Sequence, residues 1–140
     1  MALEDAKSQV DTAFTRRGQR GYAFENAFAG ATSFLRRTYT KDLTGVDLAI
    51  TGVPFDQAVT HRTGTRFGPR AIREASHMLC DGIHPHFDIS PVGQLGDAGD
   101  LSLPNTSLEG MRAALAPQAA EWIARHQMAW IGGDHSITLP

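Results

Sequence analysis

The sequence has a single cysteine, Cys80, among its 140 residues. One thiol cannot form an internal disulfide, and such sparse use of cysteine is typical of a reducing compartment. Long hydrophobic runs are also missing, because none approaches the roughly 20 residues that a membrane-spanning helix needs. The first ten residues, MALEDAKSQV, lack the apolar core of a secretory signal. We therefore expect a cytoplasmic protein without a membrane segment.

Neither sign of charge dominates the chain. Lys and Arg total 13, Asp and Glu total 15, and the formal net charge is −2. A protein that binds nucleic acid through its phosphates usually carries a marked basic excess, so the charge argues against that class of partner. The content of 41% hydrophobic and 20% charged residues is ordinary for a globular protein. A chain of this length can bury the core of one domain.

Short apolar runs predict buried strands. The runs DLAITGV at 47–53 and QMAWI at 127–131 do not alternate with polar residues, so each belongs inside a sheet that is covered on both faces. A third run, PVGQLGDAGDL at 91–101, predicts a short strand with a glycine-rich exit. Its Asp97 and Asp100 suit a structural turn, or alternatively a pair of carboxylates that share a metal ion or a proton.

Helices are predicted between these strands. Gly68 and Pro69 open one that reaches about residue 79, on which Ile72, Ala75 and Leu79 share a face in the manner of an amphipathic helix. Residues 107–126 form the other, where the interior Pro117 predicts a kink or two abutting helices. Alternating strands and helices predict an α/β fold with parallel strands. Residues 1–40 form an amino-terminal arm that packs on its own domain or on a neighbouring subunit, and residues 41–140 form the α/β part.

The stretch WIGGDHSITLP at 130–140 is the one around which we organise the chain. Two glycines end a strand, Asp134 and His135 follow, and Ser136 begins a helix. Side chains at the carboxyl end of such a strand point into the crevice where open α/β sheets bind ligands. A histidine there is suited to bind a metal or carry a proton, the alternative being a core histidine. The long loop at 55–67 leaves the same edge and is expected to face the same crevice.

Three stretches together resemble the motifs of the ureohydrolase family, which includes arginase, agmatinase and guanidinobutyrase. They are GVPFDQAVTHRTGTRFGPRAIREAS at 52–76, GDAGDL at 96–101 and GGDHSITLP at 132–140. The similarity is greatest to the agmatinase and guanidinobutyrase branch, and it implies a three-layer αβα fold with a mainly parallel sheet. It favours a structural turn at 96–101. The later family motifs, which supply most of the metal ligands, do not occur in the sequence, so the fold is expected to be incomplete.

The resemblance implies that the complete protein hydrolyses the guanidinium group of a small guanidino compound, agmatine or 4-guanidinobutyrate, to urea and an amine. It implies two Mn²⁺ ions per complete subunit, a homo-oligomer of three or six subunits, and His135 as one metal ligand. The neighbouring Asp134 is interpreted as orienting the imidazole or satisfying backbone groups. We expect the 140-residue chain alone to be inactive. The alternative is a non-catalytic product that acts only by association.

His61 and Arg62 are the candidate substrate-binding residues, on the expected rim of the site. A free arginine there binds a substrate carboxylate and favours guanidino acids, whereas a rim without one suits cationic agmatine. The alternative is that Arg62, Arg66, Arg70 and Arg73 form surface or intersubunit ion pairs. No residue is assigned a catalytic role. The pair His84 and His86 has no further ligand at suitable spacing and is interpreted as an exposed loop.

Overall fold

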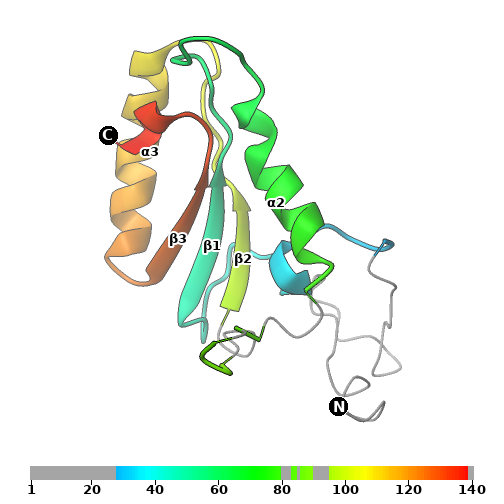
Figure 1. Ribbon diagram of the computed structural model, residues 1–140. Helices are drawn as coiled ribbons and strands as arrows, with labels where there is room; N and C mark the ends of the chain where they lie inside the picture. The colour runs from blue at the N-terminus through cyan, green and yellow to red at the C-terminus, as the bar shows by residue number, and fades with distance from the viewer. Residues whose placement is uncertain (1–27, 80–82, 85, 90–94, 139–140) are drawn as a thin grey trace.

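A parallel sheet of three strands forms the centre of the computed structural model, which describes residues 28–79, 83–84, 86–89 and 95–138 (Figure 1). The strands are β1 (Leu48–Val53), β2 (Leu95–Asp100) and β3 (Gln127–Gly132), in the order β2-β1-β3. In β1, Leu48 lies opposite Leu95 on one side and Gln127 on the other. The strands predicted at 47–53 and 127–131 are direct neighbours, and β3, expected inside the sheet, lies at its edge in the described part of the chain.

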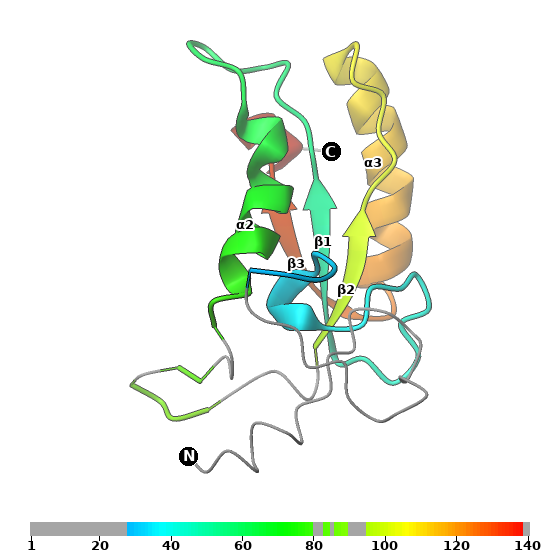
Figure 2. The ribbon, with the colours of Figure 1, turned by 90° about the vertical axis from the view of Figure 1, so that its right-hand side faces the viewer.

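Two helices cover the sheet. Helix α2 (Gly68–Ser76) and helix α3 (Leu108–Ile123) lie on opposite faces, which makes three layers (Figure 2). The Ser107 hydroxyl accepts a hydrogen bond of 3.0 Å from the Gly110 amide and so caps the start of α3. Helix α3 runs through Pro117 as one helix and does not divide into two. The predicted α/β fold with parallel strands is confirmed.

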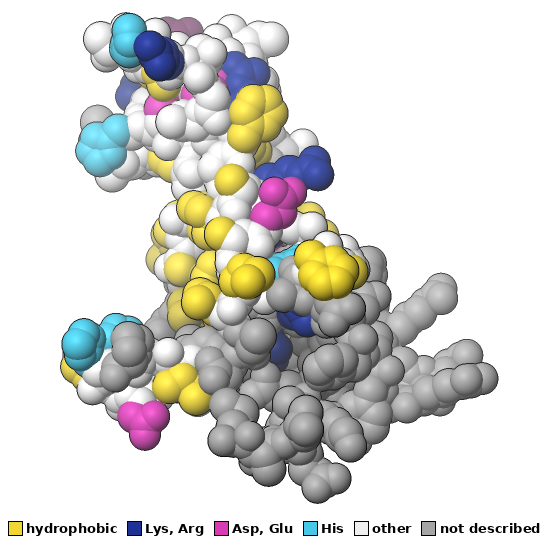
Figure 3. All heavy atoms as spheres, turned by 45° about the vertical axis from the view of Figure 1, so that its right-hand side comes forward, with side chains coloured by type: hydrophobic (Ala, Val, Ile, Leu, Met, Phe, Trp, Pro, Cys, Tyr) yellow, Lys and Arg dark blue, Asp and Glu magenta, His cyan; other side chains and the backbone are white. Residues whose placement is uncertain are grey.

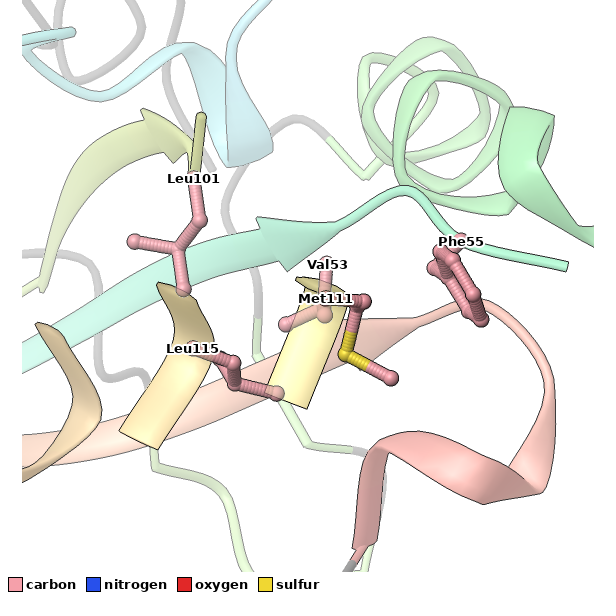
Figure 4. Packing of buried hydrophobic residues seen from close by; sticks show 5 residues of the cluster. All are labelled: Val53, Phe55, Leu101, Met111 and Leu115. Carbon is pink, nitrogen blue, oxygen red and sulfur yellow. The ribbon is translucent and has the colours of Figure 1, made fainter. Parts of the chain in front are cut away.

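The main hydrophobic cluster lies between α3 and the sheet. Val53 ends β1, Phe55 and Leu101 follow β1 and β2, and Met111 and Leu115 come from α3 (Figure 4). Phe55 and Met111 have no exposed surface. Burying side chains of this size stabilises the fold by about 1.5–3 kcal/mol each. Because Phe55 and Leu101 lie just beyond the carboxyl ends of their strands, the cluster also fixes where the following loops begin.

The buried face of α2 consists of Pro69 and two polar residues, Arg73 and Ser76. Arg73 is 4% exposed, whereas Ile72 and Leu79 are 42% and 59% exposed. Figure 3 shows hydrophobic side chains on this outer surface. The apolar face that the sequence places on α2 therefore points outward, contrary to what an amphipathic helix predicts. The reason lies in β2, whose two carboxylates face α2 and need a cation, since an unpaired buried carboxylate costs far more than an exposed isoleucine.

Arg73 forms a double ion pair with β2. Its Nε and Nη2 donate to the two carboxylate oxygens of Asp97 at 2.7 and 2.9 Å, and its Nη1 donates to Asp100 at 2.6 Å. Burial would lower the pKa of the Arg73 guanidinium, but hydrogen bonds and the charges of both carboxylates outweigh burial and raise that pKa above its ordinary value. The helix is thereby held to the strand by a fully charged contact.

Asp97 lies within β2 and is fully hydrogen-bonded. Besides Arg73, its carboxylate accepts from the amides of Phe34 at 2.7 Å and Gly99 at 2.8 Å, so that each oxygen accepts two bonds. The structural interpretation of Asp97 and Asp100 is confirmed, but the expected turn is wrong, because both belong to the strand. With its acceptor sites occupied, Asp97 has no lone pair left for a metal ion.

The two edges of the sheet differ. Beside β2, the Asp97 amide donates to the Thr38 carbonyl at 3.0 Å, and the Thr40 amide donates to the Asp97 carbonyl at 2.9 Å. Residues 38–40 of the arm thus form an isolated parallel bridge to Asp97 at that edge, whereas β3 has no partner on its outer side in the described part of the chain. The arm is also held to α2, because the Leu35 amide donates to the Ser76 hydroxyl at 2.9 Å. Residues 1–27 lie outside the described residues.

None of the described helices combines the length and apolar character needed to cross a membrane.

Candidate functional site at the carboxyl edge of the sheet

The segments that leave β1 and β3 touch at the carboxyl edge of the sheet. The Asp134 amide donates to the Phe55 carbonyl at 2.8 Å, and the Asp134 carboxylate accepts from the Ala58 amide at 2.8 Å. Both strands run in the same direction, so both chains leave at this edge. The expectation that His135 and the loop after β1 share one edge of the sheet is confirmed, although 76 residues separate Ala58 from Asp134.

Asp134 is 8% exposed, and its carboxylate accepts hydrogen bonds from backbone groups. One oxygen accepts from the Ala58 amide, and the other accepts from the amide of Ser136 at 2.9 Å and from the Ser136 hydroxyl. These bonds agree with the expectation that Asp134 satisfies nearby backbone groups. The negative charge of Asp134 is thereby surrounded by three hydrogen-bond donors.

His135 is exposed and begins the short 3₁₀ helix η4 (His135–Thr138). Its Nδ1 lies 3.5 Å from the Thr138 hydroxyl oxygen. The alternative of a buried core histidine is therefore wrong. The described residues contain no cluster of three or more His, Cys, Asp or Glu side chains that is able to hold a metal ion. Since a hard divalent cation takes about six donors, the described residues do not form a complete metal site.

The loop after β1 is folded around the buried carboxylate of Asp56. This carboxylate accepts from the Gly64 amide at 2.6 Å, from the Arg66 amide at 3.3 Å and from the Arg66 Nε at 2.6 Å. The contact closes the loop at its base and leaves residues 60–63 exposed at its tip. Asp56 was not among the functional residues predicted from the sequence. The sequence feature that could have indicated its role is an acidic residue almost directly after a buried strand, where a backbone turn needs an acceptor.

Asp56 is expected to make the stability of the protein depend on acid. The hydrogen bond from Arg66 is the largest influence and lowers the pKa of the Asp56 carboxyl from 3.8 to about 2. A depressed folded-state pKa contributes stability that is present above the unfolded pKa and is lost as the pH falls through the folded pKa. The free energy of unfolding, measured by urea denaturation from pH 5 to pH 2, should fall more in the unaltered protein than in Asp56→Asn. Parallel curves for the two would contradict this.

His61 and Arg62 lie exposed on this loop. Arg66, Arg70 and Arg73 pair with Asp56, Glu74 and the two β2 aspartates respectively. Among the described residues, Arg62 takes part in no ion pair, and no hydrogen bond joins His61 or Arg62 to His135. The interpretation as surface ion pairs is confirmed for Arg70, whereas Arg66 and Arg73 pair with buried carboxylates. The structure brings the loop of His61 and Arg62 to the same edge of the sheet as His135.

Other candidate features lie away from this edge or lack suitable groups. His84 and His86 are exposed, with ring centroids 5.9 Å apart, as an exposed loop pair predicts. An open hollow of about 390 Å³ lies between α3 and β3, with Ile123, Trp130 and Ile137 in its wall. Its lining contains no charged side chain, so it offers nothing to neutralise a cationic substrate.

Comparison with known proteins places residues 46–140 in the arginase family, whose family model matches them. The agmatinase of Chromobacterium violaceum is 39% identical, in an alignment that covers 99% of this chain and 44% of that relative. A crystal structure of a hypothetical agmatinase from Burkholderia thailandensis matches with a TM-score of 0.80 and 36% identity, over 92% of this chain and 42% of that one. The proclavaminate amidino hydrolase of Streptomyces clavuligerus matches with a TM-score of 0.72 and 27% identity, over 81% of this chain and 38% of that one. The chain thus spans less than half the length of these relatives.

Proposed function

The chain belongs to the arginase family, and from this premise we propose that the complete protein hydrolyses the guanidinium group of a small guanidino compound. Water is added at the central carbon, the bond to the substituted nitrogen breaks, and urea and an amine leave. The observation that carries the proposal is the position of His135, exposed at the carboxyl edge beside the loop after β1 and inside the matched residues. This edge is where α/β proteins bind their ligands.

We propose that His135 supplies one ligand of a two-metal site and that the metal is Mn²⁺. Imidazole and oxygen donors suit this ion. A metal pair supplies a hydroxide at neutral pH, which water alone does not provide. Because the described residues hold no complete site, the remaining ligands must come from outside them. The 140-residue chain alone should therefore bind Mn²⁺ weakly and release no urea.

The test of the proposed function is urea release by the complete protein with Mn²⁺. The panel is agmatine, 4-guanidinobutyrate, 3-guanidinopropionate, arginine and guanidine. We expect the highest rates with agmatine or 4-guanidinobutyrate. His135→Ala should lose nearly all activity, because the site would lack one of its ligands. His84→Ala, which removes an exposed histidine away from this edge, is the matched control. No urea from any compound, with metal bound, would rule the function out.

Arg62 is proposed to separate the two favoured substrates. It is the arginine of this loop and α2 that forms no ion pair within the described residues, and it lies on the loop tip at the same edge as His135. If it binds a substrate carboxylate, Arg62→Ala should raise KM for 4-guanidinobutyrate about 10-fold or more and leave KM for agmatine unchanged, since a charge-assisted bond contributes about 1.5–3 kcal/mol. Steady-state kinetics with both compounds provide the measurement. Equal effects on the two would show that Arg62 does not choose between them.

A further inference from the structure

The two segments at the carboxyl edge are joined by one side chain. The Asp134 carboxylate reaches the Ala58 amide in the segment after β1 and, through its other oxygen, the Ser136 amide in η4. We propose that Asp134 is a positioning residue that locks these two segments together and so fixes His135 relative to the loop that carries His61 and Arg62. The inference rests on the proposed function, in which His135 is a metal ligand.

The hydrogen bonds of Asp134 restrict the position of the His135 backbone. Asp134, directly before it, is bound through its amide to the Phe55 carbonyl, and Ser136, directly after it, is bound through its amide to Asp134. The approach is also close, because a Cβ on Gly133 would lie 2.5 Å from the Val53 carbonyl oxygen. The backbone of His135 is therefore held on both sides while its ring remains exposed. This is the arrangement that preorganises a ligand before the metal arrives.

The geometry also shows why an aspartate is needed. Ala58 and Ser136 both present backbone N–H groups, and each needs an acceptor. A carboxylate has two acceptor oxygens, whereas the isosteric amide of asparagine has one acceptor and one donor. In Asp134→Asn, one of these two part-buried amides must therefore face an NH₂ group. The substitution therefore removes one hydrogen bond between the two segments without a change in side-chain volume.

The experiment compares the complete protein with Asp134→Asn by hydrogen exchange and by Mn²⁺ titration calorimetry. We expect faster exchange in peptides covering residues 55–60 or 134–138, and Mn²⁺ affinity lowered about 10- to 100-fold. Asp56→Asn is the matched control, because Asp56 organises the loop after β1 without reaching η4. It should speed exchange at residues 56–66 and leave Mn²⁺ affinity unchanged.

The outcomes separate positioning from general destabilisation. Exchange as slow in Asp134→Asn as in the unaltered protein would overturn the lock. Faster exchange with unchanged Mn²⁺ affinity, or equal losses of affinity in Asp134→Asn and Asp56→Asn, would overturn the positioning of His135. Failure of the proposed function would be distinguishable, because the unaltered protein would then bind no Mn²⁺ and release no urea. The exchange data would still decide whether Asp134 joins the two segments.

Discussion

Replacing Arg73 by methionine is expected to lower the free energy of unfolding by about 3–5 kcal/mol, the usual cost of removing one partner from a buried ion pair. The guanidinium is 4% exposed, and the carboxylate of Asp97 beneath it has no exposed surface. Methionine replaces the unbranched apolar stem of arginine but leaves this carboxylate without its countercharge. Urea denaturation followed by circular dichroism measures the loss.

Two comparisons make the Arg73 result specific. Arg70→Met removes an exposed pair with Glu74 on the same helix and should cost less than about 1 kcal/mol. Adding Asp97→Asn to Arg73→Met neutralises the stranded carboxylate and should recover part of the loss, because the two sites are coupled. A denaturation midpoint for Arg73→Met equal to that of the unaltered protein would show that the pair is not what holds α2 to β2.

Gly133→Ala is expected to cost about 3 kcal/mol or more, from two independent causes. The φ angle of Gly133 is +86°, where a side chain is strained. The added Cβ would also lie 2.5 and 2.7 Å from the carbonyl oxygens of Val53 and Phe55, which are backbone atoms and cannot turn aside. The segments after β1 and β3 would have to separate, so the variant should lose Mn²⁺ affinity as well as stability.

Gly45→Ala isolates the first of these causes. Its φ angle of +76° is similar, but nothing lies within 4 Å of the added Cβ. It should therefore show only the conformational cost of about 1–2 kcal/mol. Denaturation of both variants gives the difference that belongs to the close approach. Equal losses would mean that the segments after β1 and β3 are not packed as closely as described.

The strands were predictable because their signal is local. The apolar runs at 47–53 and 127–131 correspond to β1 and β3 with shifts of one residue at their ends. The orientation of α2 was not predictable in this way. It depends on Asp97, which lies 24 residues beyond Arg73, and no periodicity within the helix reports a partner in another element. Hydropathy alone selects the opposite face.

The candidate site was likewise predictable from the sequence only in part. The position of His135 followed from strand direction and the glycines after β3, which are features of sequence order. The roles of Asp56 and Asp134 depend on backbone amides that meet their carboxylates only after folding, in one case across 76 residues. A carboxylate that binds backbone amides has no sequence motif of its own, so the residue type alone does not distinguish it from a metal ligand.

The two edges of the sheet differ in how open they are to a further strand. Residues 38–40 occupy the edge of β2 at Asp97, whereas the outer side of β3 presents its peptide groups next to an apolar hollow. In the described part of the chain, the outer side of β3 is therefore the more open place for a further strand, whether it comes from the same polypeptide or from another copy. An open edge of this kind also recruits unwanted strands, so purification of this chain alone should favour self-association through β3.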